Sequence, residues 1–386
     1  MAWAAGLAAG NASPELLARA IAGAEERLGA APDLLLLFTT VPALLAQAGK
    51  LLARIPVAAG CAPRALWLPG RGWVQAPAAV ALAARLPGAK VHPCHFRAGI
   101  LAGPDDPPQA WRRALGLGRT SPAGLLLLAT PESAHLAPLL PGLATALPGL
   151  PCLGAVVGPG RAGPKAGHLF LGGPVAGVDA IGLTFEGALE VEVISFPSCR
   201  PLGPARRVTS LQGQELGTLE DLPAAAALRK DAGPGADQLA HGLEVLVEVG
   251  SQPPDPAGDL PLPLVRTAVL VGGRVRVLAP EDVRTGQWVR FCRADPSRGA
   301  ARAAAALEAL APPGPEAGAL ILSGQGPEPG AQGPDPVEIL QAGLGAIPVA
   351  SLLTPGQIAS VPGHGPRLLG QSVVVTRFRP AAPEGS

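Results

Sequence analysis

The sequence predicts an α/β fold of mixed α+β type. It would be a two-module layered sandwich of repeated strand–helix–strand units, with largely parallel sheets and added antiparallel hairpins. One block occurs three times: an apolar run, a helix-length segment and a second apolar run entered through proline. The separation suits a helical crossover between parallel neighbours, and uninterrupted apolar runs suit strands that are covered on both faces. The paired runs are residues 34–38 with 55–61, 125–129 with 150–156, and 319–323 with 347–353.

The elements around the first block have clear boundary signals. Residues 2–9 predict a short edge strand. Ser13 and Pro14 predict the N-cap and first residue of a helix, and Gly29 predicts its end. Residues 62–99 contain short apolar runs that predict a hairpin and a covering helix. A Pro- and Asp-rich stretch then leads to the second block.

The middle of the chain predicts a change of module. Residues 178–186 and 189–196 predict two strands, and an Ala-rich helix is expected over 220–230. A proline-rich segment follows, which is typical of a linker or long loop. We therefore expect one module over residues 1–235 and a second over 236–386, with a linker at about 230–262.

The second module opens with a hairpin, because Gly272 and Gly273 separate two strand-like runs by a two-residue turn. Asp295 and Asp335 each precede a proline and predict the N-caps of two helices. The remaining expected strands are residues 287–292 and 372–378.

Composition excludes several function classes. The net charge is +1 and charged residues make up 15% of the chain, so the basic surface of a nucleic-acid-binding protein is absent from the sequence. No uninterrupted apolar run is long enough for a transmembrane helix, and no secretory signal is recognised at the N-terminus. The five scattered cysteines form no regular disulfide framework. A cytoplasmic location is the simplest expectation.

Two motifs suggest chemistry, but the sequence around them favours structural roles. Residues 158–163 match the spacing of a dinucleotide fingerprint, yet Pro164 and later glycines oppose the helix that must follow. His92, Cys94 and His95 could ligate a metal, but no second ligand pair accompanies them.

The cysteines and carboxylates give no clear catalytic set. Cys61 and Cys152 are read as occupying the same site in two repeats, and small buried thiols at strand ends are more common than nucleophiles. The paired carboxylates at 25–26, 105–106 and 220–221 are typical of solvated surface charge.

Arginines at strand exits give a more specific signal. Arg200 follows a predicted strand and stands in a proline-fixed turn, where its guanidinium could bind a carboxylate or phosphate. Arg266 and Arg293 lie in or beside apolar strands and need anionic partners, either internal, such as Asp282 or Asp295, or from a ligand.

The chain resembles the FIST family over about residues 3–380. The residues that carry the resemblance to FIST N are 32–38, 56–61, 86–91, 153–155, 182–183 and 198–203. Those similar to FIST C are 264–266, 283–291, 293–295, 345–350 and 354–358. The family's usual Ser-Cys-x-Gly-Arg-Gly and Gly-Glu motifs are replaced here by residues 323–327 and by Gly356-Gln357.

The resemblance implies a small-ligand-binding sensor module of signal transduction, standing alone, with an amino acid or another small carboxylate as ligand and a signalling protein as a further partner. Alternatives are a protein-interaction adaptor or substrate-recognition module, as in F-box proteins with FIST modules, and an enzyme using Cys61 or Cys199. No catalytic residue, metal site, cofactor, nucleic-acid partner or membrane partner is predicted. The candidate ligand-binding residues are Cys61, Gly154, Cys199, Arg200, Arg266, Ser323, Gly324, Gly356 and Gln357.

Overall fold

The structure is a computed structural model. It describes residues 1–96, 106–117, 121–130, 136–158, 168–175, 180–233, 244–255, 260, 264–277, 283–310, 314–324, 326 and 334–381. Most of the glycine-rich motif at 158–163, Asp105, Asp282 and much of the predicted linker lie outside these residues.

Three segments of the chain, here called units 1 to 3, share one order of elements. This order is an outer strand, a helix, a strand, a helix, a strand, one or two strands that join the sheet of another unit (the excursion), and a return strand. Unit 1 comprises β1 (Ala2–Ala9), α1 (Pro14–Leu28), β2 (Leu34–Thr39), α2 (Pro42–Leu52), β3 (Val57–Cys61), β4 (Ala65–Leu68), β5 (Gly72–Val74) and β6 (Ala78–Arg85). Unit 2 comprises β7 (Ala89–Phe96), α3 (Pro108–Ala114), β8 (Pro122–Ala129), α4 (Leu136–Ala146), β9 (Cys152–Val156), β10 (Leu169–Leu171) and β11 (Ala180–Gly187).

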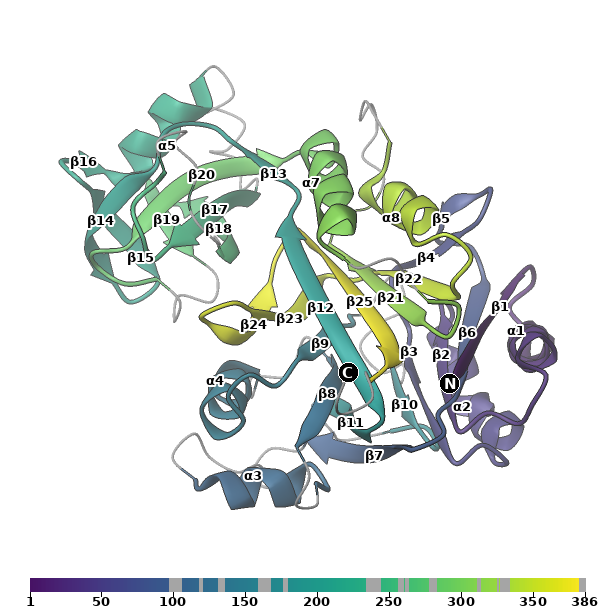
Figure 1. Ribbon diagram of the computed structural model, residues 1–386. Helices are drawn as coiled ribbons and strands as arrows, with labels where there is room; N and C mark the ends of the chain where they lie inside the picture. Colours follow the sequence, from purple (N-terminus) through teal and green to yellow (C-terminus); the bar gives the residue numbers. More distant parts are fainter. Residues whose placement is uncertain are drawn as a thin grey trace.

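Unit 3 repeats this order but contains a large insertion. Its elements are β12 (Leu189–Pro197), α7 (Pro296–Ala309), β21 (Gly318–Ser323), α8 (Pro336–Leu344), β22 (Val349–Leu353), β23 (Gly356–Val361), β24 (Gly365–Leu369) and β25 (Ser372–Pro380). The insertion lies between β12 and α7 and forms a separate lobe at one end of β12 (Figure 1). The threefold block seen in the sequence is therefore the centre of a longer structural repeat.

Each unit builds a mixed sheet around its two repeated strands. The strand orders are β1-β6-β2-β3-β10, β7-β11-β8-β9-β23-β24 and β12-β25-β21-β22-β4-β5. One pair in each sheet is parallel, namely β2–β3, β8–β9 and β21–β22, and the other pairs are antiparallel. The fold is thus mixed α/β as predicted, but the prediction of largely parallel sheets is wrong. A helical crossover makes only its own two strands parallel, and the strands that follow reverse direction.

The units exchange their excursions in a cycle. Strands β4 and β5 of unit 1 join the sheet of unit 3, β10 of unit 2 joins the sheet of unit 1, and β23 and β24 of unit 3 join the sheet of unit 2. The ends of the three proline-led strands consequently meet. Arg64 donates its backbone N–H to Leu353 O at 2.9 Å, Gly356 pairs with Val156, and Leu169 pairs with Cys61.

The insertion is an antiparallel barrel that the sequence did not predict. Strands β20-β14-β15-β19-β18-β17 pair in this order, and β17 pairs back to β20, which closes the sheet. The tight β18–β19 turn is the predicted one, with φ of 57° at Gly272 and 78° at Gly273. The insertion comprises β13 (Cys199–Pro201), β14 (Arg206–Gln212), β15 (Glu215–Leu219), β16 (Leu222–Pro223), α5 (Ala224–Ala232), β17 (Glu244–Gly250), β18 (Leu264–Val271), β19 (Arg274–Val277) and β20 (Trp288–Ala294).

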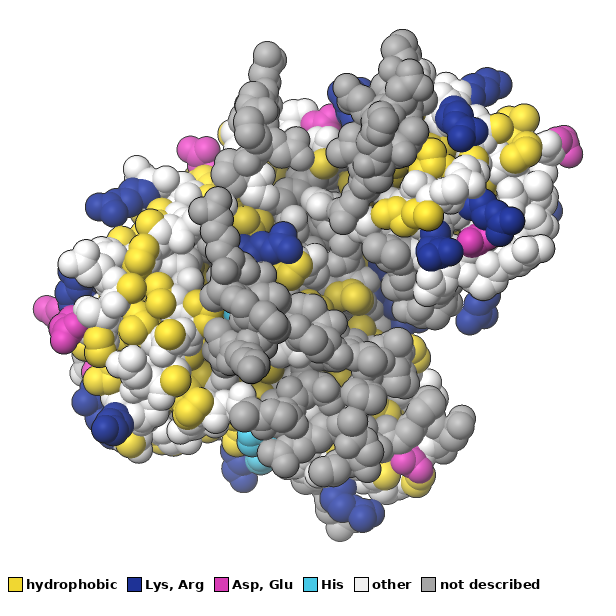
Figure 2. Space-filling model, turned by 180° about the vertical axis from the view of Figure 1, so that it is seen from behind, with side chains coloured by type: hydrophobic (Ala, Val, Ile, Leu, Met, Phe, Trp, Pro, Cys, Tyr) yellow, Lys and Arg dark blue, Asp and Glu magenta, His cyan; other side chains and the backbone are white. Residues whose placement is uncertain are grey.

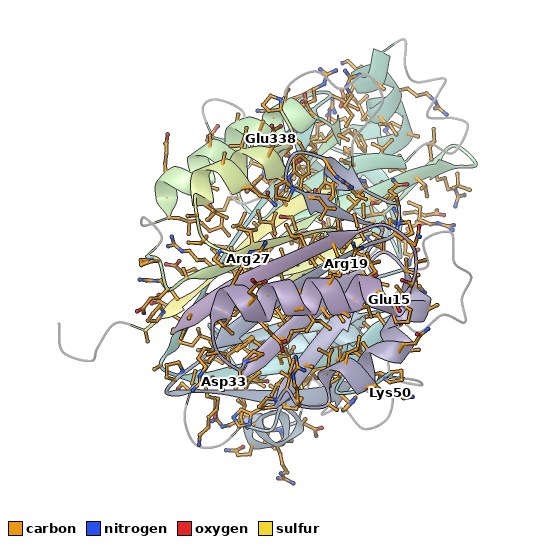
Figure 3. The ribbon with its side chains drawn as sticks, turned by 90° about the vertical axis from the view of Figure 1, so that its right-hand side faces the viewer. Glu15, Arg19, Arg27, Asp33, Lys50 and Glu338 are labelled. Carbon is orange, nitrogen blue, oxygen red and sulfur yellow. The ribbon has the colours of Figure 1, made fainter. Side chains whose placement is uncertain are left out.

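The apolar core has one central part and several outer parts. Side chains from all three sheets pack together in the centre, including Leu36 of β2, Leu128 of β8 and Leu322 of β21. The outer face of each sheet packs on its own helices, as α1 does on the sheet of unit 1, with Arg19 and Arg27 along it (Figure 3). The repeated strands are covered on both faces, which explains their continuous apolar sequence.

Local signals predicted some elements and missed others. Helix α1 begins at Pro14 and ends before Gly29, whose φ is 66°. The covering helix expected between 62 and 99 is wrong, because residues 78–85 form the buried strand β6 and no helix occurs among the described residues of that range. Pairing with β1 and β2 on both sides of β6 overrides the helical preference of its alanines.

The two predicted modules are interleaved in space. Strands on either side of residue 235 pair in three of the four sheets, for example β9 with β23 and β12 with β25. The division into sequence modules stays a prediction. Basic side chains on the face shown in Figure 2 are spread over both lobes with acidic ones among them. Among the described helices, none has the length and hydropathy of a bilayer span.

Candidate functional site

A polar network lies where unit 3 reaches the ends of the repeated strands. Gln357 is fully buried at the start of β23, and its Nε2 donates to Thr354 O at 2.8 Å and to Thr354 Oγ1 at 3.1 Å. Its Oε1 accepts the backbone N–H of Ser372 at 3.4 Å. Gly324 donates its N–H to Ser372 O at 2.9 Å, and Ser323 O accepts from Thr354. The structure thus brings together Ser323, Gly324 and Gln357, with Gly356 beside them.

Cys61 and Gly154 lie in packed surroundings nearby. Gly154 pairs with Ile358, next to Gln357, but a Cβ at Gly154 would come within 1.9 Å of Leu127 O. Close packing of strands therefore accounts for this glycine. Cys61 is fully buried in the central apolar core, and burial raises the pKa of its thiol.

The equivalence assumed for Cys61 and Cys152 is wrong. In the parallel registers, Cys61 pairs with Phe38 near the end of its strand, whereas Cys152 pairs with Leu125 at the start of its strand. The residue of unit 2 that matches Cys61 is Val156, which pairs with Ala129, the counterpart of Phe38. Counting from the leading prolines Pro56 and Pro151 gives the same result, since it matches Cys61 with Val156 and Cys152 with Val57.

The predicted arginines lie in the barrel lobe. Arg200 on β13 is partly exposed, and its Nε lies 3.6 Å from Asp295 Oδ2, so its partner is internal. Arg266 on β18 is buried and donates to Val265 O at 2.9 Å. The backbone of Val265 also accepts from Gly370, which places β18 next to the network of unit 3.

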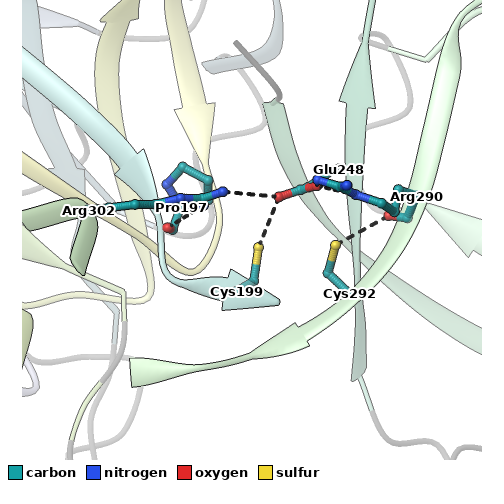
Figure 4. Close-up of polar contacts among 6 residues, drawn as sticks. All are labelled: Pro197, Cys199, Glu248, Arg290, Cys292 and Arg302. Atoms are coloured by element: carbon teal, nitrogen blue, oxygen red, sulfur yellow. Dashed lines mark hydrogen bonds and ion pairs between the residues drawn. The ribbon is translucent and has the colours of Figure 1, made fainter. Parts of the chain in front are cut away.

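Cys199 belongs to a second buried cluster, between β13, β17 and β20 (Figure 4). Its Sγ lies 3.6 Å from Glu248 Oε1, and the ligand atoms of Cys199, Glu248 and Cys292 all lie within 4.8 Å of one another. Arg290 donates to Glu248 Oε2 through Nε at 2.8 Å and through Nη2 at 2.5 Å. Contact with Cys199, burial and the charge of Glu248 together raise the pKa of Cys292.

Arg302 of α7 joins this cluster to a cavity. Its Nη2 lies 3.9 Å from Glu248 Oε1, and its Nη1 donates to Pro197 O at 2.8 Å. The cavity has a volume of about 380 Å³, within the range of small-molecule sites. Its lining residues are Ile194, Ser195, Phe196, Pro197, Arg302, Ala305, Ala306, Val361, Pro362, Leu369 and Ser372.

The cavity adjoins the predicted site through Ser372, which both lines it and binds Gln357. Among its described lining residues, Arg302 is the one charged side chain. A larger hollow of about 570 Å³ lies between the α4–β9 loop, β12 and the β23–β24 turn, but its described lining includes no Lys or Arg. The smaller cavity therefore fits an anionic ligand better.

Sequence reasoning missed Arg302, Glu248 and Ser372. Arg302 occurs within an Ala-rich helix and resembles any surface arginine, and Glu248 falls in a stretch that was assigned to the module boundary. Only the insertion of the barrel between β12 and α7 brings them together. A charged residue within the apolar run of β17 was the one available signal.

Comparisons with known proteins give a family and uncharacterized relatives. Residues 33–221 match the model of the FIST N domain. Two uncharacterized proteins of Mycobacterium tuberculosis, from strains CDC 1551 / Oshkosh and H37Rv, are each 29% identical over 248 residues. The matched segment is 62% of this chain, and the chain spans 64% of the length of these relatives.

Proposed function

We propose that the protein is a small-ligand-binding sensor module of signal transduction, because residues 33–221 match the model of the FIST N domain. The ligand would be a small carboxylate with an apolar body, such as an amino acid, held in the cavity of about 380 Å³ beside Arg302. We also propose that residues 236–386 form a FIST C-like module.

The observation that carries the proposal is a single cationic side chain, Arg302, among described lining residues that are otherwise uncharged. Glu248 already accepts two hydrogen bonds from Arg290, so its charge is balanced without Arg302. The guanidinium of Arg302 has five N–H donors and can bind a carboxylate while it still contacts Pro197. The apolar walls formed by Ile194, Phe196 and Leu369 would remove the rest of the ligand from water.

The position of the cavity suggests how binding is reported. Strand β12 and helix α7 are the two connections between the barrel and the body of three sheets, and both line the cavity. A ligand that draws Arg302 away from Glu248 would alter a contact between the barrel and α7. A ligand can shift the balance between two conformations only if its contacts differ between them, and this contact would differ.

The thiols support a binding rather than a catalytic role. Burial raises the pKa of Cys61, one of the two candidate nucleophiles, and raises that of Cys94 and Cys152 to about 12, which opposes formation of a nucleophilic thiolate at neutral pH. Arg200, which lies next to the candidate nucleophile Cys199, already pairs with an internal carboxylate, Asp295. We therefore propose that the protein is not an enzyme.

The test is a screen of amino acids and other small carboxylates by thermal shift, followed by calorimetry of each compound that raises the melting temperature. For such a compound, Arg302→Ala should weaken binding by roughly tenfold or more, because hydrogen bonds to charged groups contribute about 1.5–3 kcal/mol. Arg229→Ala is the matched control, since Arg229 is an exposed arginine on helix α5.

Arg200→Ala separates this cavity from the site expected at the strand exit. Binding that survives Arg200→Ala and is lost in Arg302→Ala supports the cavity. Loss of binding in Arg200→Ala with Arg302→Ala unaffected would instead place the ligand at β13. No response to any carboxylate at millimolar concentration would refute the sensor proposal.

A further inference from the structure

We propose that Cys199, Glu248 and Cys292 form a binding site for a zinc-class divalent cation, in which two thiolates and one carboxylate oxygen are the protein ligands. The site is distinct from the carboxylate cavity and does not depend on the proposed sensor function. Its donors come from three neighbouring strands, β13, β20 and β17, and Figure 4 shows the three side chains together.

The spacing of the donor atoms suits a tetrahedral ion. Zn–S bonds of about 2.3 Å and Zn–O bonds of about 2.0–2.2 Å at tetrahedral angles place sulfur and oxygen roughly 3.6 Å apart. Cys199 Sγ and Glu248 Oε1 are 3.6 Å apart, and the third donor, from Cys292, is within 4.8 Å of both. Bringing all three donor atoms to the spacing of a tetrahedral ion needs a shift of at most about one ångström in a side chain.

The strands position the two thiols on one face. Cys199 pairs with Ala294, and Cys292 pairs with Pro201, so the two cysteines are diagonal neighbours on adjacent antiparallel strands. Cys292 also pairs with Leu246 of β17, two residues before Glu248, and side chains two apart on a strand share a face. Three neighbouring strands therefore present the three donors to one point.

Arg290 orients the carboxylate for this role. It binds Glu248 Oε2 twice, which leaves Oε1 as the oxygen that faces the thiols. Metal ligands are commonly held in this way by a second layer of hydrogen bonds, and loss of such a partner lowers affinity about 10–100-fold.

The charges of the cluster balance with the ion present. Without metal, the carboxylate of Glu248 is matched by Arg290, and both thiols are neutral when protonated. Binding follows M²⁺ + 2 R–SH + R′–COO⁻ → [M(S–R)₂(OOC–R′)]⁻ + 2 H⁺, with a water as the fourth ligand, so the cluster gains two positive charges from the ion and loses two as protons. No oxidant or reductant takes part. Fully buried donors also need a route for the ion, and the cavity on the far side of the partly exposed Arg302 offers one.

Cobalt and zinc titrations of the full-length, reduced, chelator-treated protein test the site. Co²⁺ should bind 1:1 and give a near-ultraviolet thiolate-to-cobalt band with tetrahedral visible bands, and Zn²⁺ should displace it. Cys199→Ser and Cys292→Ser should each lower affinity at least 100-fold, and Glu248→Gln about tenfold. Cys152→Ser is the matched control, because Cys152 is a fully buried thiol in another sheet and should bind Co²⁺ as the wild type does.

A measurement on the wild type alone covers the case in which a variant fails to fold. Zn²⁺ should protect Cys199 and Cys292, but not Cys61, Cys94 or Cys152, from alkylation under partly denaturing conditions, as mapped by mass spectrometry. The proposal is overturned if Co²⁺ shows no thiolate band or if binding survives in the Cys199→Ser/Cys292→Ser variant. It is also overturned if Cys199 and Cys292 oxidise to a disulfide and the reduced protein binds no metal.

Discussion

At two glycines, neighbouring parallel strands pack so closely that no side chain larger than hydrogen fits. Gly60 of β3 and Gly154 of β9 stand next to parallel partners at a distance that leaves no room for a methyl group. A Cβ at these positions would lie 1.8 Å from Leu37 O and 1.9 Å from Leu127 O. Neither glycine has a positive φ, so close approach of backbone, and not turn conformation, requires them.

We predict that Gly154→Ala and Gly60→Ala each lower the free energy of unfolding by about 3 kcal/mol, since the clash is with backbone that cannot move aside. Chemical denaturation followed by circular dichroism measures this. Gly314→Ala is the control, because a Cβ there meets nothing within 4 Å. Equal stability of all three variants would show that the strand spacing is wrong.

The sequence could predict the repeated strands residue by residue but not their neighbours. Continuous leucine runs marked β2 and β8 because burial on both faces leaves little choice of residue. The donors Cys199 and Glu248 carry no such mark, since their meeting depends on pairings between strands far apart in sequence. The family resemblance, together with the expected meeting of strand ends, placed Gln357 and Ser323 in one candidate site, and no sequence signal pointed to Arg302.

At the scale of elements, helix α8 depends on one carboxylate that serves two units. Asp335 Oδ1 accepts from Val337 N at 2.8 Å and caps the helix, as its sequence predicts. Its Oδ2 accepts from Trp73 Nε1 at 2.7 Å, so the same side chain fastens the exchanged hairpin β4–β5 of unit 1 to unit 3. Trp67 packs edge-on against Trp73 with ring centroids 5.5 Å apart.

We expect Asp335→Ala to lower the free energy of unfolding by about 2 kcal/mol at neutral pH, through loss of the cap and of the partner of Trp73. Asp335→Asn should retain only part of the stability, because its single amide oxygen can accept from Val337 or from Trp73 but not from both. Thermal and urea unfolding of the two variants measure the difference. Identical losses in both would show that the charge, and not the acceptor, holds the helix.

The pH dependence follows from the burial of this carboxyl. Burial raises the pKa of Asp335 despite its two hydrogen-bond donors. A raised folded-state pKa contributes stability that is fully present below the ordinary aspartate pKa and is lost as pH rises through the raised value. The stability of wild type relative to Asp335→Asn should therefore fall from acid to neutral pH. A difference that grows with pH would contradict this.

At the scale of the whole molecule, the barrel is an insertion whose two ends touch. Cys199 pairs with Ala294 where the insertion begins and ends, and Asp295 donates its N–H to Ser198 O at 2.9 Å. Among the described residues of units 1 and 2, no strand lies at the corresponding position, between β1 and α1 or between β7 and α3. The hairpin at Gly272 was predictable from local signals, but barrel closure by β17 and β20 was not.

We predict that a chain in which a short Gly-Ser linker replaces residues 199–294 still folds cooperatively, because chain ends that lie side by side tolerate such exchange. Its melting temperature should be lower, since the contacts of Val265 and Glu248 with the body are lost. Circular dichroism and size-exclusion chromatography report the outcome. An aggregated product without a melting transition would mean that the barrel is integral to the body.

The cyclic exchange of strands has a consequence for synthesis on the ribosome. Strand β4 is made by residue 68, yet the strand it pairs with in its sheet, β22, begins at residue 349. At translation rates of about 5–20 residues per second, the early hairpin waits on the order of tens of seconds with an exposed edge. The nascent protein would then need shielding from its neighbours on the polysome until its last strands emerge, and a premature stop codon before β21 would leave the sheets of units 2 and 3 incomplete.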